Sequence, residues 1–193
     1  RDAFIGRTSP DLDFTTDASP DATLAVIRGW ADAHWEIGRA FGTIGLRKGD
    51  AQIEITTYRT DVYDRSTRKP VVAFGSSLAD DLVRRDFTVN AMALRLPSLE
   101  FVDLHGGLAD LAAGRLRTPA TPEESFADDP LRMMRAARFA AQLGFVVAPE
   151  VYAAMSARAS TLAMVSAERV RDEFTKLLLA PDPRQGLTLL VDT

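Results

Sequence analysis

The sequence has 193 residues, 46% of them hydrophobic and 26% charged, a composition typical of a globular protein with a sizeable core. A formal net charge of −4 and the absence of cysteine exclude a uniformly basic surface, a disulfide framework, a thiolate zinc site and a cysteine nucleophile. The two histidines, His34 and His105, are far apart in sequence and offer no metal cluster, and no apolar run is long enough to span a membrane, so we expect a cytoplasmic protein.

Short apolar runs alternate with helical stretches between residues 11 and 96, which predicts an α+β first part. The predicted strands cover residues 12–15, 41–46, 53–58 and 91–96. Gly49-Asp50 predicts a hairpin turn between the second and third strands. Residues 61–77 show neither the helical nor the strand period of hydrophobic residues. They contain several basic residues and a proline, which indicates a mobile loop.

Helical periodicity dominates after about residue 121. A long amphipathic stretch from about 129 to 144 follows prolines and acidic residues, and Pro149 opens another stretch that ends near Ser160. We therefore predict helices joined by short loops. The sequence begins at Arg1 without a signal-like segment and ends in an apolar run, so we expect a piece of a longer protein.

Asp11-Leu12-Asp13 lies where the first strand is expected. The period of two in a strand puts both carboxylates on one face and Leu12 on the other. Paired carboxylates commonly hold Mg²⁺ in phosphoryl and nucleotidyl transfer, where the ion also takes substrate phosphate oxygens. Asp-x-Asp is also common in turns and helix caps, so the tripeptide alone does not decide the function.

A third carboxylate comes from the predicted strand around Glu54. Alternation projects Glu54 to one face, while Ile53 and Ile55 face a core. Glu54 could complete the metal site or hold a ligand through a second layer of contacts. The alternative is an ordinary solvent-facing glutamate on an amphipathic strand.

The segment Arg84-Arg85-Asp86 is followed by Asn90, four residues after the aspartate. If this turn is helical, Asp86 and Asn90 share a face and could meet ribose hydroxyls, and Arg85 could bind phosphates with its planar donor fork. The alternative is a helix surface with salt bridges.

The segment Asp128-Asp129-Pro130 precedes a predicted helix, as capping and the helix dipole favour. Capping does not explain why arginines recur at every third position after it. With Asp129, these arginines predict one helix wall that carries an acid and three guanidinium groups, Arg132, Arg135 and Arg138.

In this order, these segments resemble the class II tRNA nucleotidyltransferases and bacterial poly(A) polymerases of the polymerase β-like superfamily. The first motif of that family is similar to Arg1-Asp2, Ile5-Gly6-Arg7 and Asp11-Leu12-Asp13, and the second to residues 84–91. The family's base-selecting motif, Glu-Asp-x-x-Arg, is similar to residues 128–132, where Asp128 stands in place of the glutamate.

The resemblance implies an α+β polymerase β-like head with a small mixed sheet at residues 1–120, lacking its first strand and helix. An incomplete all-helical neck at 121–193 would follow. It implies Mg²⁺ bound by Asp11 and Asp13, and Asp129 and Arg132 reading the base. From its place on the predicted strand, we expect Glu54 to be a third catalytic carboxylate. The remaining expected nucleotide ligands are Arg1, Arg85, Asp86, Asn90, Arg135 and Arg138.

The reaction implied is attack of an RNA 3′-hydroxyl on the α-phosphorus of CTP or ATP, with pyrophosphate leaving. Gly42-Thr43 favours CCA addition to tRNA, and residues 65–70 resemble the loop of enzymes that add the terminal A. Gly38-Arg39 shares an element with poly(A) polymerases, so poly(A) tailing is the alternative. A non-catalytic RNA-binding module is the third reading, against which the intact Asp11 and Asp13 speak.

Overall fold

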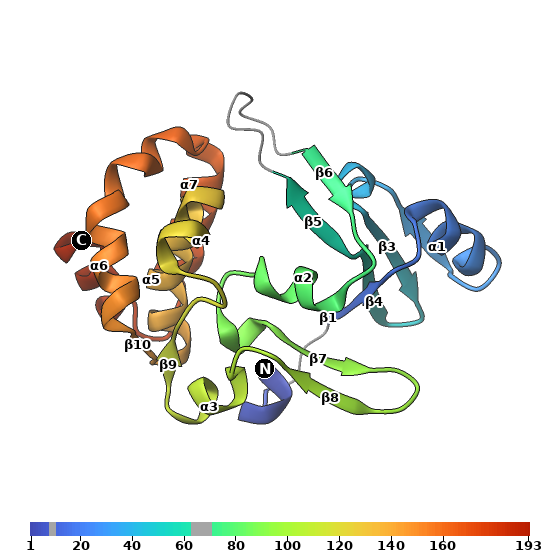
Figure 1. Cartoon of the computed structure of the whole chain (residues 1–193), viewed down its shortest axis with the longest axis horizontal. Coiled ribbons are helices and arrows are strands. Elements are labelled where there is room, and N and C mark those ends of the chain that lie inside the picture. The colour runs from blue at the N-terminus through green and yellow to red at the C-terminus, as the bar shows by residue number, and fades with distance from the viewer. Residues whose placement is uncertain (8–10, 63–70) are drawn as a thin grey trace. The chain divides into compact units, whose positions relative to one another are not determined.

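The computed structural model describes residues 1–7, 11–62 and 71–193. Contacts within the chain divide it into two compact units, Arg1–Arg84 and Arg85–Thr193. The first unit contains a four-stranded sheet and the second a hairpin and most of the helices (Figure 1). Within these described ranges, no helix is both long and apolar enough to cross a membrane.

The sheet of the first unit has the strand order β1-β4-β3-β2. Its strands are β1 Asp11–Thr16, β2 Ala33–Trp35, β3 Thr43–Lys48 and β4 Ala51–Thr57. β1 runs parallel to β4, whereas β3 is antiparallel to both β4 and β2, so the sheet is mixed, as expected. The predicted turn joins β3 to β4, and Gly49 there adopts a left-handed φ of 56°.

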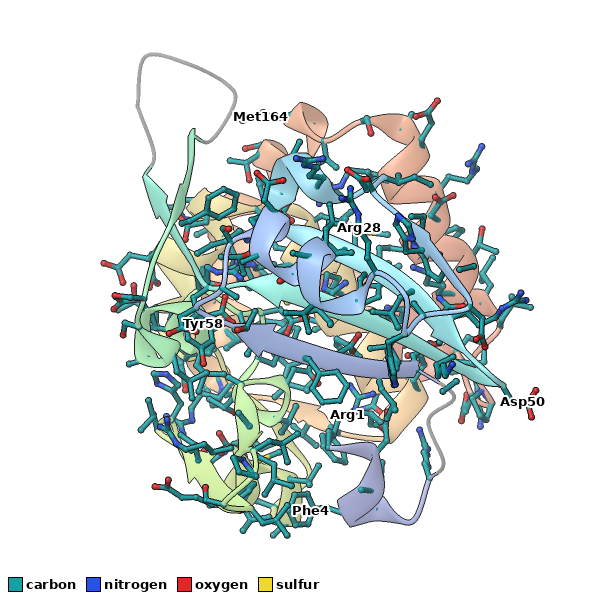
Figure 2. All side chains as sticks on the ribbon, turned by 90° about the vertical axis from the view of Figure 1, so that its right-hand side faces the viewer. Arg1, Phe4, Arg28, Asp50, Tyr58 and Met164 are labelled. Carbon is teal, nitrogen blue, oxygen red and sulfur yellow. The ribbon has the colours of Figure 1, made fainter. Side chains whose placement is uncertain are left out.

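Helix α1, Pro20–Ile27, covers one face of this sheet. Ser19 caps it by accepting a hydrogen bond from the Ala22 N–H at 3.2 Å. Its buried side chains meet the apolar residues of β3 and β4 in a core of Leu24, Ile27, Ile44, Leu46 and Ile53. Figure 2 shows α1 in front of the sheet, with the labelled Asp50 and Tyr58 near the two ends of β4. The opposite face of the sheet is therefore left for polar side chains.

Short elements complete the first unit: η1 Asp2–Ile5, η2 Arg39–Phe41, β5 Arg59–Val62, β6 Val71–Phe74 and α2 Leu78–Val83. The prediction of a loop over residues 61–77 is wrong at both ends. β5 pairs antiparallel with β6, and Ser77 caps α2. The strands escaped the sequence reading because they are short and held by backbone pairing, without clear alternation of side chains. Residues 63–70, including Arg65 and Pro70, lie outside the described residues.

The second unit begins with η3 Thr88–Asn90 and a hairpin of β7 Met92–Arg95 and β8 Glu100–Asp103. After α3 Gly107–Ala112, β9 Arg115–Leu116 pairs with β10 Val146–Val147. The later helices are α4 Pro122–Asp128, α5 Leu131–Leu143, α6 Pro149–Arg158, η4 Ala159–Met164, α7 Ala167–Leu178 and α8 Arg184–Asp192. The two predicted helical stretches are confirmed as α5 and α6.

Helix α5 packs against α7 and α8 in the second unit. Ala136, Ala137 and Ala140 are buried on it, which lets neighbouring helices approach closely. Gly186 of α8 shows how close: a Cβ there would lie 2.4 Å from the carbonyl oxygen of Ala137. The aromatic ring of Phe139 packs edge-on against Phe87, with ring centroids 5.8 Å apart. Helix α5 is therefore anchored in the core of its unit.

Candidate active site

The three predicted catalytic carboxylates lie on adjacent strands of the first unit. Register pairs Asp13 with Glu54 and Asp11 with Gln52 across the parallel strands β1 and β4. Residues in register on neighbouring strands point to the same side, so Asp11, Asp13 and Glu54 share one face of the sheet. Ile53 points to the other face, into the core under α1. The structure thus brings these carboxylates to the polar face, as the alternation predicts.

The chemistry of these donors suits Mg²⁺. Asp11 and Asp13 are exposed and Glu54 is half-buried, so solvent and a ligand can reach them. Mg²⁺ prefers oxygen ligands and commonly takes one or two carboxylates together with water and substrate phosphates. Among the described residues, no group of three or more acidic, histidine or cysteine side chains is arranged to hold a metal. By its coordination preference, Mg²⁺ on this face would take substrate oxygens as well as Asp11 and Asp13.

The polar face continues beyond the carboxylates. The hydroxyls of Thr43 and Thr56 are 2.9 Å apart, and the Thr15 hydroxyl donates to Asp81 of α2 at 3.4 Å. Asp81 is fully buried and forms an ion pair with Arg84. Sequence reasoning missed Asp81 as the residue that holds α2 against β1. The i, i+3 spacing of Asp81 and Arg84 was the available signal.

Arg1, a predicted nucleotide ligand, is paired with its neighbour. Its Nε and Nη2 atoms donate to the two carboxylate oxygens of Asp2 at 2.8 and 2.9 Å. This two-pronged pairing lowers the pKa of Asp2 below its ordinary value. Binding of a phosphate by Arg1 would have to compete with Asp2, and that role stays a prediction.

In the second unit, Asp86 is the centre of a hydrogen-bond network. Its Oδ1 accepts from the Asn90 side chain at 3.0 Å and from the Phe87 N–H at 2.8 Å. Its Oδ2 accepts from Arg135 Nε at 2.9 Å. Burial opposes ionisation of Asp86, but the Arg135 charge and these hydrogen bonds outweigh it, so its pKa lies below the ordinary value. Asp86 is therefore a buried, charged and fully hydrogen-bonded carboxylate.

The turn that joins Asp86 to Asn90 is not an α-helix. Helix α2 ends at Val83, and only Thr88–Asn90 forms a 3₁₀ turn. Asp86 and Asn90 nevertheless meet, as the spacing suggested. The Arg85 Nη1 atom donates to the backbone carbonyl of Asn90 at 3.4 Å. The predicted contacts of Arg85, Asp86 and Asn90 with a nucleotide stay predictions.

The three arginines of α5 have different principal hydrogen-bond partners, and their joint role with Asp129 stays a prediction. Arg132 Nη1 donates to the Ser125 hydroxyl at 2.9 Å on α4. Arg135 pairs with Asp86, and Arg138 Nε donates to Glu173 of α7 at 2.6 Å. Each three-residue step turns by about 300° around an α-helix, which leaves successive side chains about 60° apart. Arg132 therefore reaches α4, whereas Arg135 and Arg138 both approach Glu173 of α7.

Arg138 is the most enclosed of these arginines. It is 9% exposed, bonds Glu173 and also donates to Gln142 at 2.8 Å. Its guanidinium also lies 4.0 Å from the centre of the Phe139 ring. Burial lowers the pKa of Arg138 despite the charge of Glu173. Sequence reasoning did not single out Glu173, whose buried carboxylate is also 3.7 Å from Arg135 Nη1.

The predicted base-reading pair has separate partners. Asp129 Oδ1 accepts from the Leu131 N–H, two residues further on, at 3.2 Å, and its Oδ2 is 2.8 Å from Arg169 Nη2 on α7. Arg132 bonds Ser125 instead. Both side chains are partly exposed. The backbone hydrogen bond and the ion pair hold the Asp129 carboxylate, and base reading by Asp129 and Arg132 stays a prediction.

Comparison with known proteins identifies relatives along the whole chain. The model of the Poly A polymerase head domain matches residues 1–117, and that of the probable RNA and SrmB-binding site of polymerase A matches residues 144–193. The CCA-adding enzymes of Streptococcus pneumoniae (strain CGSP14) and Bacillus subtilis (strain 168) are 43% and 41% identical over 194 aligned residues. These alignments cover 100% of this chain and 47% and 48% of the relatives.

Solved structures agree with the sequence comparison. The Bacillus stearothermophilus CCA-adding enzyme in complex with CTP matches with a TM-score of 0.88 and 36% identity, over 100% of this chain and 45% of that one. The chain spans about half the length of the curated relatives it matches. The predicted fold class and the resemblance to tRNA nucleotidyltransferases and poly(A) polymerases are confirmed. This chain therefore belongs to the poly(A) polymerase head-domain family.

Proposed function

We propose that this protein is a template-independent RNA nucleotidyltransferase that adds C and A from CTP and ATP to the 3′ end of tRNA. One observation carries the proposal. The chain aligns over its whole length with CCA-adding enzymes and keeps Asp11, Asp13 and Glu54 on one accessible sheet face. Poly(A) tailing is the alternative, which the family model of the poly(A) polymerase head supports.

In the proposed reaction, Asp11 and Asp13 hold Mg²⁺ on the polar face of the sheet. Mg²⁺ held there would supply positive charge that favours deprotonation of the RNA 3′-hydroxyl and offsets charge on the leaving pyrophosphate. Glu54 lies directly opposite Asp13 on the neighbouring strand and adds a third negative group that orients the ligands of the two aspartates. Arg85 contributes a guanidinium for the phosphates. The chemistry therefore needs no histidine or serine nucleophile.

Base selection is proposed for Asp129 and Arg132. Cytosine and adenine both offer an amino donor beside a ring-nitrogen acceptor, which an aspartate and an arginine can satisfy. Uracil and guanine reverse both groups and leave partners unpaired, at about 1–3 kcal/mol per contact. The 2.8 Å ion pair with Arg169 holds the Asp129 carboxylate in place for such a contact.

We also propose a head up to about residue 120 and a helical neck from 121 to 193. The two family models support a boundary in this region, since one ends at residue 117 and the other starts at 144. The described contacts divide the chain earlier, after Arg84. Because tRNA, CTP and ATP are cytoplasmic molecules, the proposed reaction implies a cytoplasmic protein.

Incubation of the full-length protein with Mg²⁺, tRNA lacking its 3′ CCA and labelled nucleotides tests the proposal. CTP alone should add a short run of C, and CTP with ATP should complete CCA and stop. A long tail from ATP alone would instead establish a poly(A) polymerase. Binding of tRNA without any incorporation would leave the non-catalytic RNA-binding module and overturn both enzymatic readings.

A further inference from the structure

One row of the four-stranded sheet contains a residue from every strand. Trp35 of β2 lies opposite Gly45 of β3, Gly45 opposite Glu54 of β4, and Glu54 opposite Asp13 of β1. Residues that are paired in this way point to the same face. Trp35 therefore belongs to the polar face with the carboxylates, away from the core under α1.

The indole of Trp35 lies over the backbone of Gly45. A Cβ added to Gly45 would come within 2.0 Å of Trp35 Nε1 and 2.2 Å of its Cε2. Gly45 is not among the glycines with positive φ, so a backbone conformation does not require glycine there. Glycine is required there for steric reasons, because the indole ring occupies the position that a Cβ atom would take.

This position puts an aromatic surface beside the carboxylates. Neighbouring strands are about 4.8 Å apart, so the ring over Gly45 is about one strand spacing from the backbone of Glu54. Trp35 is partly exposed. The core on the opposite face is formed by Leu24, Ile27, Ile44, Leu46 and Ile53 and does not use this ring. The indole is therefore accessible to a ligand that reaches the carboxylates.

We propose that Trp35 is the stacking platform for the 3′-terminal base of the RNA acceptor, an inference that rests on the proposed function. The acceptor must bring its 3′-hydroxyl to the carboxylate row, and its last base then lies within reach of the adjacent ring. Stacking on an aromatic side chain accepts every base because each has a π-face. That tolerance suits the acceptor end, whose last base changes as nucleotides are added, whereas an incoming base must be discriminated by hydrogen bonds.

The test compares Trp35→Ala and Trp35→Phe in the full-length protein. Loss of one base–aromatic stack should raise the KM for the tRNA acceptor about tenfold in Trp35→Ala, and Trp35→Phe should recover most of it. The KM for CTP should stay unchanged. An acceptor with an abasic 3′-terminal nucleotide should bind wild type about tenfold more weakly than the normal acceptor, whereas Trp35→Ala should not distinguish the two.

Gly45→Ala is the matched variant, since its Cβ displaces the indole without removing it. It should reproduce the acceptor defect of Trp35→Ala, and the double variant should be no worse than Trp35→Ala alone. Melting temperatures of all variants separate this effect from loss of fold.

Three results would overturn the assignment while leaving the proposed function intact. The first is an unchanged KM for the tRNA acceptor in Trp35→Ala. The second is a rise in acceptor KM, from wild type to Trp35→Ala, that is equally large for the normal and the abasic acceptor. The third is a rise in the KM for CTP with no change in the KM for the acceptor. The second would make Trp35 a structural residue, and the third would place the incoming base on the ring. If wild type incorporates neither nucleotide, the proposed function fails and the acceptor assignment fails with it.

Discussion

Replacing Glu173 by alanine should destabilise the protein more than any exposed charge change in the same helical region. Glu173 is 4% exposed and accepts from Arg138 Nε at 2.6 Å, with Lys176 Nζ at 3.3 Å. Arg138 is itself 9% exposed, so the variant leaves a buried guanidinium with no carboxylate at its Nε, held by the Gln142 hydrogen bond and the Phe139 ring. Removing one member of a buried ion pair typically costs about 3–5 kcal/mol.

Glu173→Gln should lose about half of that amount, because an amide oxygen can still accept from Arg138 but brings no charge. Urea unfolding followed by circular dichroism measures both variants. Asp172→Ala on the same helix is the control: its 2.9 Å pair with Arg171 is similar in length but exposed, and its loss should be barely detectable. A Glu173→Ala loss as small as that of the control would refute the reasoning that burial makes this pair matter.

Asp13→Asn should abolish nucleotide incorporation without changing the melting temperature, whereas Asp50→Asn in the exposed turn of the same sheet should keep full activity; incorporation assays on both variants test this. The pKa of Asp86 is lowered in the folded state, so its stabilisation is full above the unfolded pKa of roughly 3.9 and is lost as pH falls through the folded pKa. Asp86→Asn should therefore weaken the fall of the free energy of unfolding with decreasing pH at acid pH. An unchanged pH dependence in that variant would contradict a lowered pKa of Asp86. Asp129→Ala should narrow the preference for CTP and ATP over UTP and GTP in competition assays by about 1–3 kcal/mol; wild-type discrimination would return Asp129 to a helix cap.

The sequence predicted those parts of the site that depend on local periodicity. Alternation along residues 11–13 and 52–56 predicted which face receives Asp11, Asp13 and Glu54, and the register of β1 with β4 agrees. Gly49-Asp50 predicted the hairpin because turn chemistry is also local. The β5–β6 pair was missed because its strands depend on backbone pairing across residues that show no period.

Partner choice could not be predicted in the same way. Asp86 and Arg135 are 49 residues apart, Asp129 and Arg169 are 40 apart, and Arg138 and Glu173 are 35 apart. The sequence offers 27 acidic and 23 basic residues, and spacing along one helix cannot select among them. Tertiary packing of α5 against its neighbours makes that selection.

The geometry of α5 explains why its three arginines take different roles. Each three-residue step turns by about 300°, so Arg132 and Arg138 point about 120° apart, with Arg135 between them. One end of this arc faces α4, where Arg132 meets Ser125, and the other faces α7, where Glu173 encloses Arg138. Arg135 keeps 33% of its side chain exposed while it holds Asp86. Arg138 keeps only 11% of its side chain exposed, so of these two arginines Arg135 is the more accessible, and both lie within 4 Å of the carboxylate of Glu173.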